Sequence, residues 1–217
     1  MATELVVFDC DGVLVDSEVV VIEIEADLLT EAGFAITADQ IADRFVGLSY
    51  PDMMNELETD FGRPVPAALS ERIQRDAVAA FPERLQAVAG MYDLLRTLEA
   101  PRCVASSSNL DRVELSLDVT ELAPFFETDH VFSAQMVDSG KPAPDLFLHA
   151  ADQLDTDPQA CVVVEDSPHG VTAAMAAGMR VIGFVGGRHA RPSLTARLTA
   201  AGADVIIDDP QQIHELL

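Results

Sequence analysis

The first of four short motifs that could do chemistry is Asp9-Cys10-Asp11-Gly12, directly after the apolar run from Leu5 to Phe8. In an extended segment, side chains at positions i and i+2 project from the same side, so the two carboxylates face one region. Carboxylates this close repel each other unless a cation lies between them or one of them holds a proton. The motif therefore indicates a cation site or a proton-transfer site, although an ordinary acidic turn would have the same composition.

The second motif, Ser106-Ser107-Ser108-Asn109, follows the apolar run Cys103-Val104-Ala105. Hydroxyl and backbone N–H groups at a turn from strand to helix can hold phosphate oxygens. Ser106, Ser107 and Asn109 are therefore candidate phosphate-binding residues. The alternative is that the cluster serves only as the N-cap of the next helix.

The third motif contains Lys141, the only lysine among 13 lysine and arginine residues. It lies in Ser139-Gly140-Lys141-Pro142-Ala143-Pro144, where two prolines stiffen the loop. A position that keeps lysine where the rest of the chain uses arginine is a candidate for a compact ammonium that binds phosphate. A solvated lysine in a turn is the alternative.

The fourth motif, Glu165-Asp166-Ser167-Pro168, again places acids after an apolar run, Cys161 to Val164. Hard divalent cations prefer carboxylate oxygens, which makes Glu165 and Asp166 candidate Mg²⁺ ligands. Ser167-Pro168 has the pattern of an N-cap followed by proline at the first helical position. Acids that stabilise this helix N-terminus through its dipole are the alternative.

These motifs follow short apolar runs that are typical of buried parallel strands. Helical patterns lie between the runs, and the alternation predicts an α/β fold with a Rossmann-like parallel sheet. The carboxyl ends of such strands share one edge of the sheet, so the motifs are expected to meet there. From about residue 18 to residue 85 the chain has helical spacing and no convincing strand, which predicts a helical insertion after the first strand. We expect a core of residues 1–16 and 87–217 and an inserted domain of residues 17–86.

As a set, the four motifs and the helical insertion resemble the haloacid dehalogenase superfamily. Within that superfamily the chain is similar to the subgroup of β-phosphoglucomutase and the sugar-phosphate phosphatases, in which a helical (C1-type) cap domain follows the first motif. The resemblance implies that Asp9 is the nucleophile and forms an aspartyl-phosphate, and that Asp11 is the general acid and base. It implies a Mg²⁺ ion held by Asp9, Asp166 and the backbone carbonyl of Asp11, with Glu165 as a ligand or as a residue that orients one. Ser106 and Lys141 would bind the phosphoryl oxygens.

Departures from the patterns of this superfamily narrow the expected activity to a Mg²⁺-dependent phosphatase acting on a small phosphate monoester, a sugar phosphate or phosphorylated sugar acid. Dehalogenases lack the second aspartate, and phosphonatases need a cap lysine that the insertion does not contain. The cap histidine and arginine of the mutases match Val21 and Tyr50 here, which favours a phosphatase over a mutase. The candidate residues for substrate specificity in the insertion are Arg44, Tyr50, Arg72 and Arg75.

Three alternatives stay open. One is a phosphosugar mutase like β-phosphoglucomutase with rearranged cap contacts. Another is a non-enzymatic phospho-receiver domain, which also uses clustered aspartates, Mg²⁺ and a lysine, but is shorter and carries its aspartate on a middle strand. The third is a degenerate binding protein, which is disfavoured because every reactive position is filled.

The chain carries 37 acidic and 13 basic residues, a formal charge of -24, which repels nucleic acid and anionic membranes. Neither a signal peptide nor a long apolar run is recognisable. We therefore expect a cytoplasmic protein, a monomer or weak homodimer, with a small phosphate ester as its partner and no nucleic-acid or membrane partner.

Overall fold

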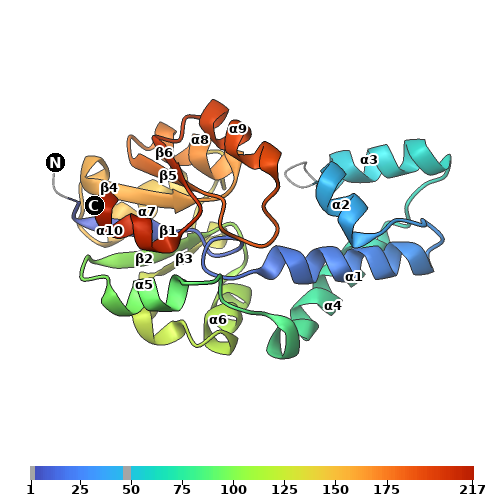
Figure 1. Ribbon diagram of the computed structural model, residues 1–217, viewed down its shortest axis with the longest axis horizontal. Coiled ribbons are helices and arrows are strands. Elements are labelled where there is room, and N and C mark those ends of the chain that lie inside the picture. The colour runs from blue at the N-terminus through green and yellow to red at the C-terminus, as the bar shows by residue number, and fades with distance from the viewer. Residues whose placement is uncertain (1–2, 46–49) are drawn as a thin grey trace. The chain divides into compact units, whose positions relative to one another are not determined.

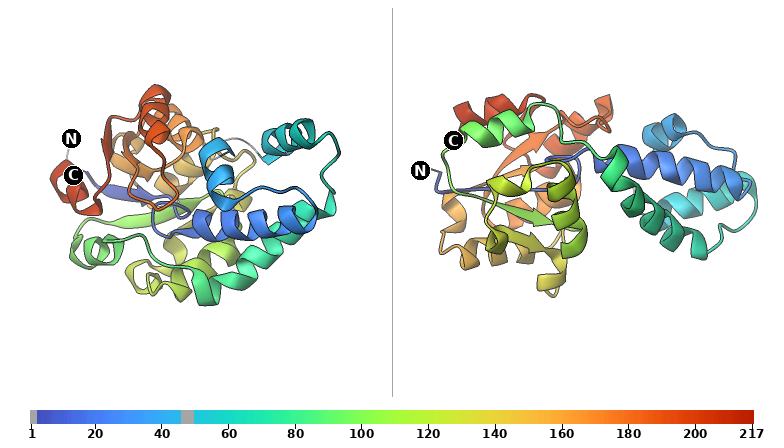
Figure 2. Two further views of the ribbon diagram at one scale, coloured as in Figure 1. Left: turned by 45° about the vertical axis from the view of Figure 1, so that its right-hand side comes forward. Right: turned by 90° about the horizontal axis from the view of Figure 1, so that it is seen from below.

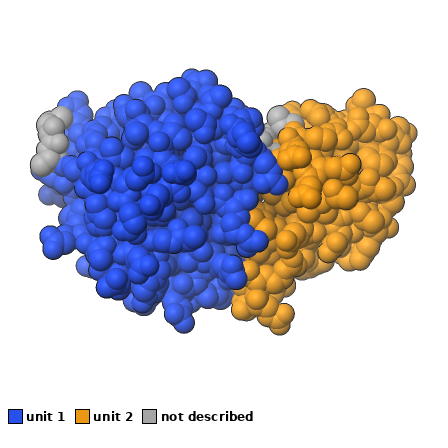
Figure 3. All heavy atoms as spheres, viewed as in Figure 1, with its two compact units in different colours: residues 1–16, 85–217 blue, residues 17–84 orange. Residues whose placement is uncertain are grey.

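The computed structural model describes residues 3–45 and 50–217, and it divides the chain into two compact units (Figures 1 and 3). The first, here called the α/β unit, comprises residues 1–16 and 85–217. The second, the helical unit, comprises residues 17–84. The helical unit thus interrupts the α/β unit shortly after its first strand.

The α/β unit is built on a six-stranded sheet of order β3-β2-β1-β4-β5-β6 in which every neighbouring pair is parallel. The order reverses direction beside β1, and this is where open α/β sheets bind ligands, at the carboxyl ends of the strands. The strands are β1 (Leu5–Phe8), β2 (Arg102–Ser106), β3 (Val131–Ser133), β4 (Cys161–Glu165), β5 (Arg180–Phe184) and β6 (Val205–Ile207). The α-helices of this unit are α5 (Met91–Thr97), α6 (Leu110–Val119), α7 (Asp145–Gln153), α8 (Pro168–Ala176), α9 (Pro192–Ala201) and, after the last strand, α10 (Ile213–Leu216).

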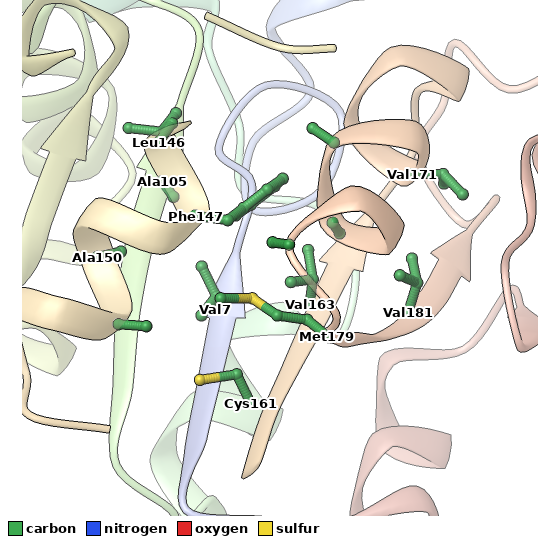
Figure 4. Close-up of a cluster of buried hydrophobic side chains, with 14 of the residues drawn as sticks. Val7, Ala105, Leu146, Phe147, Ala150, Cys161, Val163, Val171, Met179 and Val181 are labelled. Carbon is green, nitrogen blue, oxygen red and sulfur yellow. The ribbon is translucent and has the colours of Figure 1, made fainter. Parts of the chain in front are cut away.

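Both faces of the sheet are buried, which is why its strands are apolar at successive positions rather than at alternate ones. Every residue of β1 is at most 1% exposed. On one face, Val7 and Val163 pack with Phe147 of α7 and Val171 of α8, as the close-up in Figure 4 shows. This packing fixes the ends of β1 and β4, from which the acidic motifs project.

The apolar runs that precede the acidic and serine-rich motifs predict β1, β2 and β4, and Ser167-Pro168 predicts the start of α8. The structure confirms the α/β class with its parallel sheet. Ser167 is the N-cap of α8, with its side chain accepting a hydrogen bond from the N–H of Gly170 at 3.0 Å. The prediction misses β3, because its sequence, Val131–Ser133, contains only two successive apolar residues.

The helical unit contains four helices in its described residues, namely α1 (Ser17–Glu31), α2 (Ala38–Phe45), α3 (Tyr50–Phe61) and α4 (Ala68–Arg84) (Figure 2). It has a hydrophobic core of its own, with Leu29, Ile41, Leu57 and Ile73 at its centre. A separate core means that the unit can keep its internal structure independently of the sheet.

Candidate active site

The candidate site lies where three neighbouring strands of the sheet end. Asp9 follows β1, Ser106 ends β2, and Glu165 ends β4 and is followed by Asp166. The N–H of Asp9 still donates to the carbonyl of Val164 at 3.0 Å, so the sheet pairing holds Asp9 beyond the end of its strand. The expectation that the motifs meet at one edge of the sheet is confirmed.

Lys141 joins two of the acids. Its Nζ lies 2.6 Å from Oδ1 of Asp9 and 2.7 Å from Oε1 of Glu165, and it also donates to the carbonyl of Ala105 at 2.9 Å. The ammonium sits 4.8 Å from the centre of the Phe147 ring, and its side chain is 3% exposed. The only lysine of the chain is therefore a buried cation with three oxygen partners, and the alternative of a solvated lysine in a turn is wrong.

Asp11 is held by two donors from the segment after β2. The hydroxyl of Ser108 donates to its Oδ2 at 2.6 Å, and the guanidinium of Arg112 donates to its Oδ1 at 2.9 Å. Ser108 is itself fixed, because its carbonyl accepts a hydrogen bond from Ser133 at 2.7 Å. The Asp11 carboxylate is thus ordered beside Asp9 without a direct ion pair to Lys141.

Glu165 and Asp166 have different partners although they are adjacent. Oε2 of Glu165 accepts from both the backbone N–H and the hydroxyl of Ser167 at 2.9 Å, so the start of α8 fixes this side chain. Oδ2 of Asp166 lies 3.0 Å from Nε2 of His189, a residue in the loop after β5. Each acid is therefore oriented by a separate part of the fold.

Burial controls the protonation of these groups. Removal from water raises the pKa of Asp9 well above its ordinary value, whereas the charge of Lys141 opposes the rise. For Asp166, burial also raises the pKa, and the hydrogen bond from His189 lowers it. Burial lowers the pKa of Lys141, but Asp9 and Glu165 raise it by more, so the lysine stays charged across the physiological range.

The donor set suits a divalent cation. Asp9, Glu165 and Asp166 are buried and can each place one carboxylate oxygen within 4.8 Å of the others. Three buried carboxylates exceed the positive charge that one lysine supplies, and a hard cation with oxygen ligands would remove the excess. The side chains of these three residues fit Mg²⁺, and that of Asp11, held by Ser108 and Arg112, is not in the group.

The residues of the serine-rich motif have different surroundings, and only one of them is buried at the end of β2. Ser106 is buried, and its Oγ accepts the N–H of Ser108 at 3.0 Å. Asn109 caps α6 by accepting the N–H of Arg112 at 2.9 Å, and Ser107 is exposed at the end of β2. The N-cap interpretation thus holds for Asn109, whereas a phosphate-binding role for the three candidates stays a prediction.

The specificity candidates lie in the helical unit. The arginine side chains form ion pairs at its surface, Arg44 with Asp60, Arg72 with Glu31 and Asp76, and Arg75 with Asp76. Tyr50 begins α3, but its side chain lies outside the described residues. Their role in specificity stays a prediction.

Sequence reasoning misses three residues of the site: Ser108 and Arg112, which hold Asp11, and His189, which holds Asp166. Ser108 belongs to the second motif but carries no signal that separates it from its neighbours. Arg112 and His189 reach the acids only through the fold. The double glycine at Gly186-Gly187 is the one local hint, because it marks a close backbone approach.

A doubly wound parallel sheet with a buried Asp–Lys–Glu cluster at its switch point places the protein among α/β proteins with an acidic site at the carboxyl ends of the strands. The chain belongs to the haloacid dehalogenase-like hydrolase family, whose model matches residues 6–184. It is similar to the 6-phosphogluconate phosphatase of Escherichia coli, with 30% identity over 197 residues, covering 90% of this chain and 89% of the relative. The predicted enzyme class, a phosphoric-monoester hydrolase, is thereby confirmed, as is the resemblance to the sugar-phosphate phosphatases.

Two solved structures support the assignment to the haloacid dehalogenase-like family. A haloacid dehalogenase-like protein of unknown function from Agrobacterium tumefaciens has 39% identity and a TM-score of 0.92, covering 99% of this chain and 97% of that chain. A hydrolase of the family from Deinococcus radiodurans, solved with bound phosphate and sodium, has 30% identity and a TM-score of 0.85, covering 99% and 94%. In the described part of this chain, no helix is long and apolar enough to cross a membrane.

Proposed function

We propose that the protein is a magnesium-dependent phosphatase that cleaves a small phosphate monoester, a sugar phosphate or a phosphorylated sugar acid, through an aspartyl-phosphate on Asp9. The observation that carries the proposal is the buried carboxylate of Asp9 at the end of β1, 2.6 Å from the Lys141 ammonium. The relatives add support, since one of them is a 6-phosphogluconate phosphatase.

In the first step, a carboxylate oxygen of Asp9 attacks the phosphorus, and the bond from phosphorus to the alcohol oxygen breaks. Asp11 gives its proton to the departing oxygen, which leaves as the free alcohol. In the second step, Asp11 takes a proton from water as the water oxygen attacks the phosphorus, and the bond to Asp9 breaks to release phosphate. The hydrogen bonds from Ser108 and Arg112 fix the orientation of the Asp11 side chain, which supports its proposed role in both proton transfers.

The phosphoryl oxygens of the substrate are negatively charged, and the chain has a formal charge of -24, so the site must supply local positive charge to bind them and to stabilise the transition state. Lys141 supplies one fixed positive charge beside the attacking oxygen. A Mg²⁺ ion held by Asp9, Asp166 and the backbone carbonyl of Asp11, with Glu165 as a nearby ligand or orienter, would neutralise the phosphoryl oxygens when bound. Ser106, Ser107 and Asn109 are the proposed hydroxyl and amide contacts to phosphate.

The helical unit is proposed to act as the cap that selects the leaving group, with Arg44, Tyr50, Arg72 and Arg75 as candidate contacts. The helical unit is inserted after the first strand and has a hydrophobic core of its own, which supports a separate role for this unit in substrate specificity. The proposal also includes action in the cytoplasm as a monomer or weak homodimer. The net negative charge supports the lack of nucleic-acid and membrane partners.

A panel of substrates tests the proposal. Phosphate release is measured with hexose phosphates, phosphorylated sugar acids, a nucleoside monophosphate and a small activated phosphate ester, each with Mg²⁺. We expect the sugar phosphates or sugar-acid phosphates to give the highest kcat/KM. Preference for the nucleotide would overturn the substrate class. Isomerised sugar instead of free phosphate, from a hexose 1-phosphate with a bisphosphate primer, would show a mutase.

A further inference from the structure

The loop between β5 and α9, residues 185–191, carries a buried histidine that the catalytic scheme above does not use. His189 is 5% exposed, and its Nε2 lies 3.0 Å from Oδ2 of Asp166. An ionised carboxylate can only accept a hydrogen bond, so the ring nitrogen is the donor. His189 is therefore a direct partner of a proposed cation ligand.

Two glycines make room for this contact. A Cβ atom on Gly12 would lie 1.9 Å from Oδ2 of Asp166 and 2.8 Å from Cε1 of His189. A Cβ atom on Gly187 would lie 2.7 Å from the carbonyl oxygen of Gly12 and 2.9 Å from the same ring. The segment after β1 and the loop after β5 thus fit closely around the pair of His189 and Asp166, and neither glycine has room for a side chain there.

The same loop also forms a hydrogen bond with the segment that follows β1. The N–H of Arg188 donates to Oδ1 of the buried Asp16 at 2.8 Å. Asp16 is the last residue of the α/β unit before the chain enters the helical unit. Because adjacent residues of the loop hold the segment after β1 and the segment after β4, the ring of His189 has little freedom to move away from Asp166.

The distribution of donors explains why Asp166 needs such a partner. Lys141 contacts Asp9 and Glu165 directly, and Glu165 has Ser167 in addition. Within residues 3–45 and 50–217, the direct donor to the side chain of Asp166 is His189. A buried carboxylate without a donor could turn or take up a proton, and either change would remove a cation ligand.

We propose that His189 is a positioning residue that holds one oxygen of Asp166 and thereby sets the affinity of the site for a divalent cation. The inference rests on the proposed function, since it assumes that Asp166 is a ligand. Hydrogen-bond partners of this kind orient the ligands of metal sites, and their loss usually weakens metal affinity about 10–100-fold.

The test compares two amide variants of the whole protein. In His189→Gln the side-chain nitrogen is as many bonds from Cα as Nε2 of histidine, so it can still donate to Asp166. In His189→Asn the nitrogen corresponds to Nδ1, too short to reach. The control is His169→Ala, which alters an exposed histidine near Asp166 in the sequence. Mg²⁺ affinity is measured by isothermal titration calorimetry without substrate.

We expect His189→Asn to bind Mg²⁺ at least about tenfold more weakly than the wild type, and His189→Gln and His169→Ala to stay within about threefold. In assays, the Mg²⁺ concentration for half-maximal activity should rise for His189→Asn, while kcat at saturating Mg²⁺ changes little. Circular dichroism checks that the variants fold. Equal Mg²⁺ affinity in His189→Asn and the wild type would overturn the inference and leave the proposed function standing, whereas a wild type that binds no Mg²⁺ would overturn both.

Discussion

The two compact units differ in how they accommodate a buried carboxylate. In the α/β unit, Asp9 and Glu165 share the ammonium of Lys141, at 2.6 and 2.7 Å. In the helical unit, Glu25 of α1 is 5% exposed, and no hydrogen bond or ion pair to it is found within residues 3–45 and 50–217. One unit surrounds its buried acids with donors, whereas the other buries an acid that has no donor among the described residues.

The consequence is seen in protonation. For Asp9, the charge of Lys141 opposes the effect of burial on the pKa. For Glu25, burial raises the pKa to about 7, and the negative charge of Glu18 adds to the rise. Burial raises the pKa of both acids, and they differ in that Asp9 has a cation beside it whereas Glu25 has a second acid. Glu25 alone would mislead a search that uses burial as its criterion for a catalytic site.

Removing the charge of Asp9 is the strongest way to break this comparison. Asp9→Asn should abolish phosphate release, because covalent catalysis has no path without the nucleophile, while the amide still accepts the hydrogen bond of Lys141. Turnover of an activated phosphate ester is measured together with circular dichroism. Activity above about a tenth of the wild type would remove Asp9 from the nucleophile role.

Chelation tests whether the acids of the α/β unit need more positive charge than Lys141 provides. We expect EDTA to silence the enzyme and Mg²⁺ to restore it, because Asp9, Glu165 and Asp166 place carboxylate oxygens within 4.8 Å of one another. Phosphate release is followed before chelation, after it and after Mg²⁺ is added back. Full activity after exhaustive chelation would rule out the cation.

Lys141→Arg tests whether a positively charged side chain of a different shape can replace the ammonium of Lys141. The ammonium has three oxygen partners and a side chain that is 3% exposed, which leaves little space for the broad, planar guanidinium. We expect kcat/KM to fall at least about 100-fold, equivalent to roughly 2.7 kcal/mol of transition-state stabilisation.

The matched control is Arg96→Lys, the opposite exchange at an exposed residue of α5, which should leave activity unchanged. If Lys141→Arg works within about threefold of the wild type, a positive charge of either shape is sufficient at this position.

Much of the α/β unit is predictable because its strands are buried on both faces. Apolar runs such as Leu5 to Phe8 identify these strands, and the acids that follow them must meet because parallel strands end at one edge. The reversal of strand order beside β1 depends on long-range pairing, which local sequence does not encode. Likewise, Arg112 and His189 approach the acids through a helix and a loop, and the one local hint in these sequences is the double glycine that precedes His189.

Substrate choice cannot be predicted in the same way. Arg44, Arg72 and Arg75 form ion pairs at the surface of the helical unit, and side chains of this kind occur on any solvated helix. The burial of Glu25 cannot be predicted from the sequence either. A glutamate on a helix is ordinarily expected to face solvent, and only the packing of α1 shows that this one is buried.

The smallest expected effect concerns Glu25 and tests the helical unit's side of the comparison. Because its pKa is raised to about 7 from 4.5, the folded state favours the protonated form. Below about pH 4.5 Glu25 is protonated in both the folded and the unfolded state and does not affect the free energy of unfolding. As the pH rises from 4.5 toward 7, the unfolded state ionises first, and the free energy of unfolding falls. A shift of this size corresponds to at most about 3 kcal/mol, and we expect about 2 kcal/mol between pH 5 and pH 8.

Glu25→Gln removes the titration but keeps the shape of the side chain, so its free energy of unfolding should lack this part of the pH dependence. Urea unfolding at pH 5 and pH 8 measures the difference between the variant and the wild type, which cancels the repulsion of the remaining acids. Glu71→Gln, an exposed residue of α4, is the control and should follow the wild type. If the wild type and Glu25→Gln lose the same stability between the two pH values, Glu25 has a compensating partner, and the two units do not differ in the way described.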